Sequence, residues 1–132
     1  MKRSVHELRG RISHERFWIA APGASAVALG AMGAHLLQGR LAPAMLAVWQ
    51  TAVQFQFWHA LALALALLTL PDGPARRIAC AGFGFGMALF CGSLYALALG
   101  APRGIGVLTP FGGLALMAGW IALGIAAVRP RS

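Results

Sequence analysis

The stretch IACAGFGFGMALFCGSLYALAL, residues 78–99, decides the fold. Its 22 residues include no Asp, Glu, Lys or Arg and are rich in alanine, leucine and glycine. At a rise of about 1.5 Å per residue, an α-helix of this length extends about 33 Å, enough to cross a hydrocarbon core about 30 Å thick. The stretch therefore predicts a transmembrane helix.

Three further stretches, of 21, 21 and 22 residues, also lack charged residues: 17–37, 50–70 and 107–128. The chain of 132 residues is 59% hydrophobic and 11% charged, with a mean hydropathy of +0.72. A soluble domain carries about 25% charged residues. Together the four stretches predict an all-α integral membrane four-helix bundle that forms one domain, 17–128.

Short connections join the predicted helices, at 38–49, 71–77 and 100–106. Because short connections make sequential helices antiparallel neighbours, we expect an up-down topology. A basic arm (1–16) precedes the domain and a basic tail (129–132) follows it.

The distribution of Lys and Arg predicts the orientation in the membrane. Arm, second connection and tail carry five, two and two of these residues, whereas the first and third connections carry one each. An up-down bundle thus places nine basic residues on one side and two on the other. By the positive-inside rule, the N and C termini are predicted to be cytoplasmic.

The net charge of +8 bears on partners. The basic residues lie beside the ends of apolar stretches and form no stripe interleaved with aromatic residues, which argues against nucleic acid. Anionic headgroups of membrane lipids at the cytoplasmic side are the expected partner, since each nearby basic residue contributes about 1 kcal/mol.

Small residues in the predicted helices indicate close packing. Gly82 and Gly86 are four residues apart, and Gly30 repeats at the same spacing with Ala26 and Ala34. Small residues at this spacing let helix backbones approach closely, as packing in lipid requires.

The predicted helices contain a set of polar residues, and most fall in the half away from the cytoplasm. Gln56 and His59 are three residues apart and should face one direction. We expect side chains from the other helices to meet them there. The candidate cluster is His35, Gln56, His59, Ser93, Tyr95 and Thr109.

This candidate cluster has more than one interpretation. Such side chains can simply form hydrogen bonds between helices, each worth about 0.6–2 kcal/mol. They can also line a polar cavity for a small molecule, a lipid headgroup or an ion. Catalysis is the least favoured interpretation, because the predicted helices hold no charged residue and no evident set of nucleophile, base and orienting group.

Cofactor binding is not expected. A zinc site needs three or four ligands, and His6 and His14 lie on the opposite side from His35 and His59. Axial haem ligands on upright helices should lie at similar depth, whereas His35 and His59 differ by about 10 Å. We therefore predict neither a metal nor another cofactor.

Five short motifs occur in order along the chain: GAMGAH at 30–35, FQFWHAL at 55–61, GSLY at 92–95, TPFGG at 109–113 and GW at 119–120. They resemble the GAFGAH, YQxxHxL, GSLY, TPxGG and GW motifs of the YgdD-like family of small inner-membrane proteins. This family, domain of unknown function 423, includes the eukaryotic transmembrane protein 256. The resemblance covers 17–128, and Phe55 stands where the family has tyrosine.

The resemblance implies a multi-pass four-helix protein of the bacterial inner membrane, and it supplies no reaction. We assign the glycines of its motifs to helix packing: Gly30, Gly33, Gly112 and Gly113.

Our leading hypothesis is a non-enzymatic membrane protein whose polar cluster packs helices and binds a small ligand, lipid or partner. One alternative is a transport or channel module that works as a homo-oligomer or with another membrane protein. A quinone or haem redox subunit is a weaker alternative. No inverted repeat is evident, which weakens the transport hypothesis.

Overall fold

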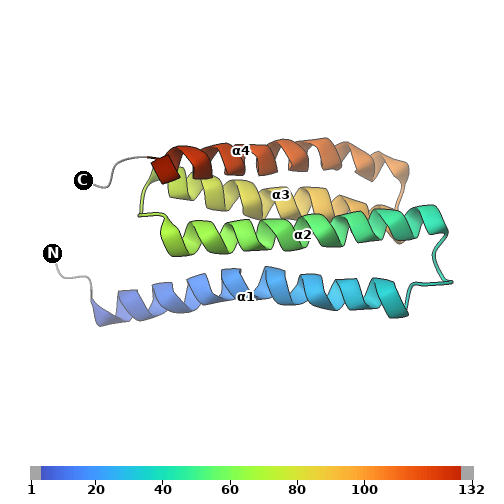
Figure 1. Cartoon of the computed structure of the whole chain (residues 1–132), viewed down its shortest axis with the longest axis horizontal. Coiled ribbons are helices and arrows are strands. Elements are labelled where there is room, and N and C mark those ends of the chain that lie inside the picture. The colour runs from blue at the N-terminus through green and yellow to red at the C-terminus, as the bar shows by residue number, and fades with distance from the viewer. Residues whose placement is uncertain (1–3, 129–132) are drawn as a thin grey trace.

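A computed structural model describes residues 4–128, and this part of the chain is helical with no strand. Its elements are α1 (Val5–His35), α2 (Pro43–Thr69), α3 (Pro74–Ala98), the 3-10 helix η1 (Arg103–Val107) and α4 (Leu108–Val128). The four α-helices lie lengthwise beside one another (Figure 1). Each of α1, α2, α3 and the combined η1–α4 is long and apolar enough to cross a membrane. The prediction of four long apolar helices is confirmed.

Local sequence accounts for the helix ends. Pro43 and Pro74 stand in the first turns of α2 and α3. Backbone N–H groups in the first turn have no partner within the helix, so the N–H that proline lacks costs no hydrogen bond there. The loops after α1 and α3 contain Gly39 and Gly100, with φ of 76° and 99°. Glycine adopts this left-handed conformation without the steric penalty of a Cβ atom.

The N-terminal part of the chain is helical. Ser4 caps α1 by accepting a hydrogen bond from the Glu7 backbone N–H. The helix then continues without a break into the apolar stretch, so residues 5–16 of the predicted basic arm belong to α1. The predicted basic tail, 129–132, lies outside the described residues.

The second helix begins earlier than the apolar stretch 50–70 because Pro43 starts it. Gln56 consequently stands at the midpoint of α2, which has 27 residues.

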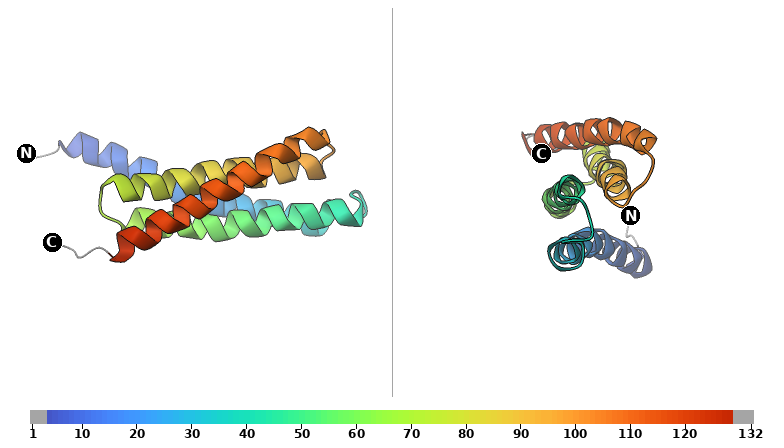
Figure 2. Two further views of the ribbon diagram at one scale, coloured as in Figure 1. Left: turned by 90° about the horizontal axis from the view of Figure 1, so that it is seen from above. Right: turned by 90° about the vertical axis from the view of Figure 1, so that its right-hand side faces the viewer.

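The four helices do not form a closed bundle. The backbone of α3 lies close to both α2 and α4, whereas the backbone of α1 approaches only α2. The end-on view in Figure 2 shows α1 on the far side of α2 from α4. One side of α3 is therefore left open toward α1.

Glycines account for the close approach of α3 and α4. A Cβ atom on Gly82 would lie 2.8 Å from the Ala115 carbonyl oxygen and 2.8 Å from the Gly119 nitrogen. A Cβ atom on Gly112 of α4 would lie even closer to the backbone nitrogen of Phe90. Close backbone approach through small residues is typical of helix packing in lipid.

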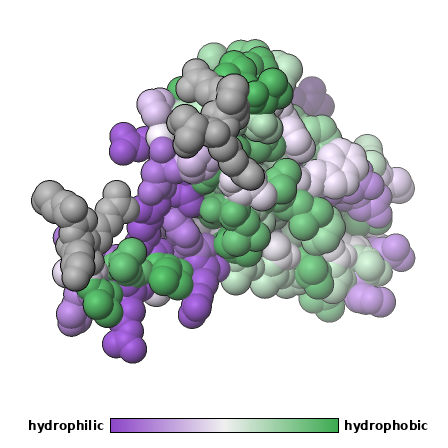
Figure 3. Space-filling view, turned by 60° about the vertical axis from the view of Figure 1, so that its left-hand side comes forward, coloured by the Kyte–Doolittle hydropathy of each residue, from purple (hydrophilic) through white to green (hydrophobic). Residues whose placement is uncertain are grey.

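The interior is built mainly from small side chains, and Phe83 is its largest fully buried residue. Many large apolar side chains point outward instead, among them Phe85, Phe111 and Ile121. Figure 3 shows hydrophilic residues gathered on the N-terminal part of the molecule and apolar residues over much of the remaining visible face. An apolar exterior of this extent suits a lipid environment.

Candidate functional site

Gln56 connects three helices. Its side chain is only 8% exposed, and its Nε2 donates to the Pro22 carbonyl oxygen (3.0 Å) and to Ser25 Oγ (2.8 Å) of α1. Tyr95 Oη of α3 donates to Gln56 Oε1 at 2.8 Å. Both amide hydrogens and the amide oxygen are thus engaged within the protein. We call Gln56, Ser25 and Tyr95 the glutamine junction.

A tryptophan extends the contact between α1 and α2 beyond this junction. Trp49 is almost completely buried, and its Nε1 donates to the Leu29 carbonyl oxygen of α1 at 2.9 Å. Its ring lies edge-on to that of Tyr95, with centroids 4.7 Å apart. A Cβ atom on Gly33 would lie 2.8 Å from Trp49 Cδ1, so glycine makes room for the indole. A Cβ atom on Gly30 would likewise lie 3.3 Å from Val53 Cγ1 of α2.

His59 faces a different part of the protein from Gln56. It is 6% exposed, and its Nδ1 lies 2.6 Å from the Phe55 carbonyl oxygen one turn earlier in α2. A carbonyl oxygen can only accept, so Nδ1 carries the hydrogen. The imidazole stacks on Phe55 and lies 6.1 Å from the rings of both Phe83 and Trp120. It thus belongs to an aromatic cluster between α2, α3 and α4.

Ser93 and Thr109 form a third polar contact, between α3 and α4. Their hydroxyl oxygens are 2.6 Å apart, and Ser93 Oγ also donates to the Phe90 carbonyl oxygen at 2.9 Å. Since Ser93 has a single hydrogen to donate, Thr109 is the donor between the two hydroxyls. Gly112 and Gly113 lie against Phe90 nearby.

The expected single cluster is thus divided into three separate contacts, and His35 joins none of them. His35 is the last residue of α1 and is exposed; no hydrogen bond or ring contact within residues 4–128 involves its side chain. The expectation that it meets Gln56 and His59 was wrong, because α1 is placed so that Pro22 and Ser25 stand beside Gln56.

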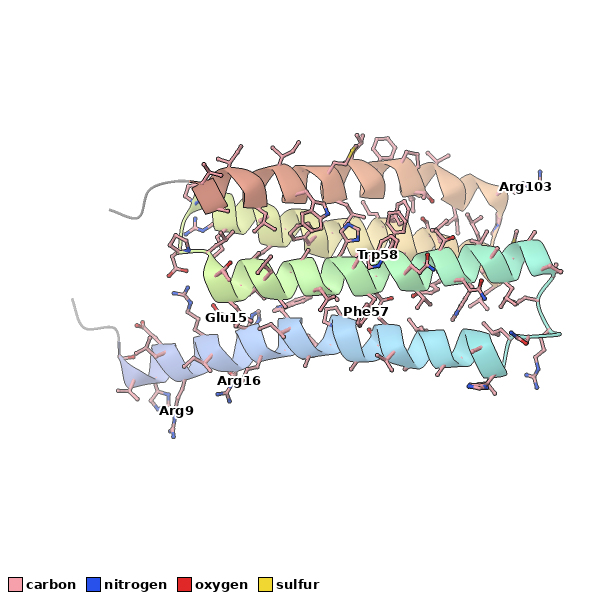
Figure 4. All side chains as sticks on the ribbon, in the orientation of Figure 1. Arg9, Glu15, Arg16, Phe57, Trp58 and Arg103 are labelled. Carbon is pink, nitrogen blue, oxygen red and sulfur yellow. The ribbon has the colours of Figure 1, made fainter. Side chains whose placement is uncertain are left out.

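A charged network that the sequence analysis did not predict lies at the α2–α3 loop. Glu15 of α1 accepts from Arg11 Nε (3.4 Å) and Arg76 Nη2 (3.0 Å). Asp72 pairs with the same two arginines, at 2.8 Å from Arg76 Nη1. Asp72 raises the pKa of Arg11, chiefly through their side-chain hydrogen bond. Figure 4 shows Glu15 on the side of α1 that faces α2, with Arg9 and Arg16 on the opposite side.

The spacing of these residues could have revealed the network. Arg11 and Glu15 are four residues apart, as are Asp72 and Arg76. Charges at this spacing pair on a helix surface. The network connects α1 to the start of α3, so it complements the glutamine junction.

A groove runs between α1 and α3, with α2 as its floor. We call it the α1–α3 groove. Its central part has a volume of about 470 Å³ and is almost wholly apolar. The residues that line this part are Trp18, Leu63, Leu67, Cys80, Ala81, Gly84, Phe85 and Ala88.

The groove continues in both directions along α3. Toward Tyr95 it passes into a space of about 280 Å³ that shares Trp18, Leu63 and Gly84 with the central part. Toward the α2–α3 loop it passes into a space of about 360 Å³ beside the charged network. Nothing lies within 4 Å of a Cβ atom placed on Gly84, so the groove is open there.

The chemistry available in these sites is limited. The polar atoms of the glutamine junction are directed at one another, and His59 Nδ1 bonds to a backbone carbonyl of its own helix. Within residues 4–128, no three His, Cys, Asp or Glu side chains are grouped to hold a metal ion. The groove, by contrast, presents apolar surface that the protein itself leaves uncovered.

Four long apolar helices fastened by buried hydrogen bonds define the class: a small multi-pass membrane protein. More particularly, the chain belongs to the family described as protein of unknown function DUF423, whose model matches residues 29–113. The family resemblance seen in the motifs is confirmed. None of the solved structures matches the chain.

Several relatives share most of their length with this chain. The UPF0382 membrane protein YwdK of Bacillus subtilis is 40% identical over 107 residues, which cover 79% of this chain and 87% of the relative. A UPF0382 membrane protein of Haemophilus influenzae is 38% identical, over 86% of this chain and 93% of the relative. The UPF0382 inner membrane protein YgdD of Escherichia coli is 37% identical, with coverages of 78% and 80%. This chain is accordingly a multi-pass protein of the bacterial inner membrane.

Proposed function

We propose that this protein is a non-enzymatic membrane protein that binds one chain-shaped apolar molecule, a lipid tail, in the α1–α3 groove. The observation that carries the proposal is the open apolar surface between α1 and α3. Its central volume of about 470 Å³ falls within the range of about 300–1,000 Å³ typical of ligand sites. A groove lined by small, aliphatic and two aromatic side chains, with almost no polar surface, suits a hydrocarbon chain.

In this proposal the polar residues position α1 rather than contact the ligand. Gln56 uses both of its amide hydrogens on Pro22 and Ser25, so it has no hydrogen left to donate to a bound molecule, although its side chain lines the part of the groove with a volume of about 280 Å³. The glutamine junction holds α1 on α2 while leaving the adjacent face of α3 uncovered. The polar residues thus keep the packing role that the sequence predicted for them. The proposed ligand site is the groove beside them rather than the polar residues themselves.

We also propose an up-down antiparallel bundle with both ends on the cytoplasmic side. Figure 1 supports this topology, since the start of α1 and the end of α4 lie toward the same end of the molecule. The charged network lies at that end too, near the α2–α3 loop. Basic residues favour the cytoplasmic side of a membrane.

The test measures lipid that remains with the purified protein. Wild type, Gly84→Leu and Gly124→Leu are purified identically in mild detergent, and co-purifying lipids are quantified by mass spectrometry. A leucine at 84 fills the groove, whereas Gly124 lies on α4, also with open space around its Cβ position. We expect about one lipid per chain for wild type and Gly124→Leu, and a large loss for Gly84→Leu. Equal lipid in all three proteins would refute the proposal.

A further inference from the structure

The end of the α1–α3 groove beside the α2–α3 loop is cationic. The space of about 360 Å³ at this end is lined by Arg11, Arg76, Arg77 and Asp72. It shares Leu67 and Cys80 with the apolar central part, so the two form one continuous surface. We call this charged end the groove mouth. A molecule that fills both parts must combine a hydrocarbon chain with a group that tolerates guanidinium neighbours.

The charges at the groove mouth do not cancel. Within residues 4–128, Arg11 and Arg76 both pair with Glu15 and Asp72, so two arginines face two carboxylates there. Arg77 adds a third guanidinium; it is exposed and forms no ion pair within residues 4–128.

Arg76 contributes an unused hydrogen-bond donor. Its side chain is 13% exposed, and its Nε is buried without a hydrogen-bond partner. A buried donor without a partner is a cost to the folded protein. Among the described residues, the groove mouth therefore has more guanidinium groups than carboxylates, and the excess charge is positive.

The dimensions match one leaflet of a bilayer. Arg77 and Ala88 are eleven residues apart on α3, which corresponds to about 17 Å along a helix. Half of a hydrocarbon core is about 15 Å thick. An acyl chain whose polar end lies at Arg77 would thus extend along the apolar groove to about the position of Ala88.

We propose that the occupant of the groove is an anionic glycerophospholipid, with its phosphate at Arg77 and one acyl chain along α3. This inference rests on the proposed function and names the class of its ligand. A zwitterionic lipid carries its own ammonium group and gains less from the excess positive charge. A second copy of this chain, docked by two-fold symmetry at the groove mouth, would bring another Arg77 toward the first and place like charges together.

The experiment compares two lipids that differ only in headgroup. The whole chain is stripped of lipid in detergent and mixed with phosphatidylglycerol or phosphatidylcholine of identical acyl chains, and native mass spectrometry measures the bound fraction. The variants are Arg77→Gln and, as its control, Arg103→Gln. Arg103 is also exposed and stands at the opposite end of α3, in η1. Neither arginine has an ion pair within residues 4–128, so neither change threatens folding.

We expect wild type and Arg103→Gln to retain phosphatidylglycerol in preference to phosphatidylcholine. Arg77→Gln should weaken phosphatidylglycerol binding about fivefold, which corresponds to ~1 kcal/mol for one basic residue, and leave phosphatidylcholine unchanged. Equal binding of the two lipids by wild type, or equal effects of the two variants, would refute the proposal that the ligand is anionic. Either result would leave the proposal of a lipid tail in the α1–α3 groove unaffected. Failure of wild type to retain either lipid would overturn the proposed function as well.

Discussion

Replacing Gln56 with leucine should detach α1 from the rest of the protein more readily than any other single change of a polar residue. The substitution keeps the volume of the side chain and removes three hydrogen bonds, to Pro22, Ser25 and Tyr95. Hydrogen bonds between helices in lipid contribute about 0.6–2 kcal/mol each. We expect the free energy of unfolding to fall by about 2–4 kcal/mol, because the Tyr95 hydroxyl also loses its acceptor.

The assay is reversible unfolding in mixed micelles, followed by circular dichroism and tryptophan fluorescence. Gln54→Leu is the matched control: Gln54 is exposed on the same helix, and no hydrogen bond within residues 4–128 involves its side chain. Its replacement should change stability by less than about 0.5 kcal/mol. Tyr95→Phe combined with Gln56→Leu should cost less than the sum of the single changes, since both remove the same bond. Equal stability of Gln56→Leu and Gln54→Leu would refute the role of the glutamine junction.

Two further predictions concern packing and charge. Gly82→Ala should cost about 1–3 kcal/mol because the added Cβ meets the α4 backbone at 2.8 Å, whereas Gly84→Ala, in open space two residues away, should stabilise the helix by up to about 1 kcal/mol. The same unfolding assay measures both, and equal costs would contradict the packing described. Glu15→Gln should lower stability by about 0.5–1 kcal/mol at low salt and by much less in 1 M NaCl, because its pairs with Arg11 and Arg76 are partly exposed. Glu7→Gln, which removes a charge outside the network, is the control; a salt-independent loss for Glu15→Gln would argue against an ionic role.

The apolar stretches contain enough information to predict four helices. Each stretch lacks charged residues over a length that crosses a bilayer. The lipid around a helix imposes this requirement whatever the helix packs against, so the pattern can be recognised without knowing the tertiary contacts. The starts of the helices are less evident from the same signal. Pro43 begins α2 before the apolar stretch at 50–70, and α1 includes the polar residues from Val5 onward.

The relative placement of helices is what the sequence does not determine. Gln56, Ser93 and Tyr95 were recognisable as polar residues that need partners in lipid. Which residues they meet depends on the axial offset between helices, and that offset places Ser25 rather than His35 beside Gln56. The three-residue spacing of Gln56 and His59 separates them by about 60° around the helix. This angle is large enough that Gln56 reaches α1 and α3, whereas His59 lies in the aromatic cluster between α2, α3 and α4.

The groove also could not be read from the sequence. Gly82 and Gly84 are two residues apart in one glycine-rich stretch, yet Gly82 lies against α4 and Gly84 faces open space. Small residues permit a close neighbour without specifying that one is present. Only the position of α1, set by the glutamine junction and the charged network, reveals which small-residue face stays uncovered.

The central claim, that the face of α3 beside α1 lies open to the bilayer, can be tested by oxygen accessibility of a spin label in liposomes. Ala88 lines the groove and Ala118 lies exposed on α4 at similar predicted depth; each is changed to cysteine and labelled after Cys80 and Cys91 are replaced by alanine. We expect both labels to be mobile and similarly accessible to molecular oxygen. An immobile label at residue 88 that oxygen cannot reach, beside an accessible one at residue 118, would contradict the open groove.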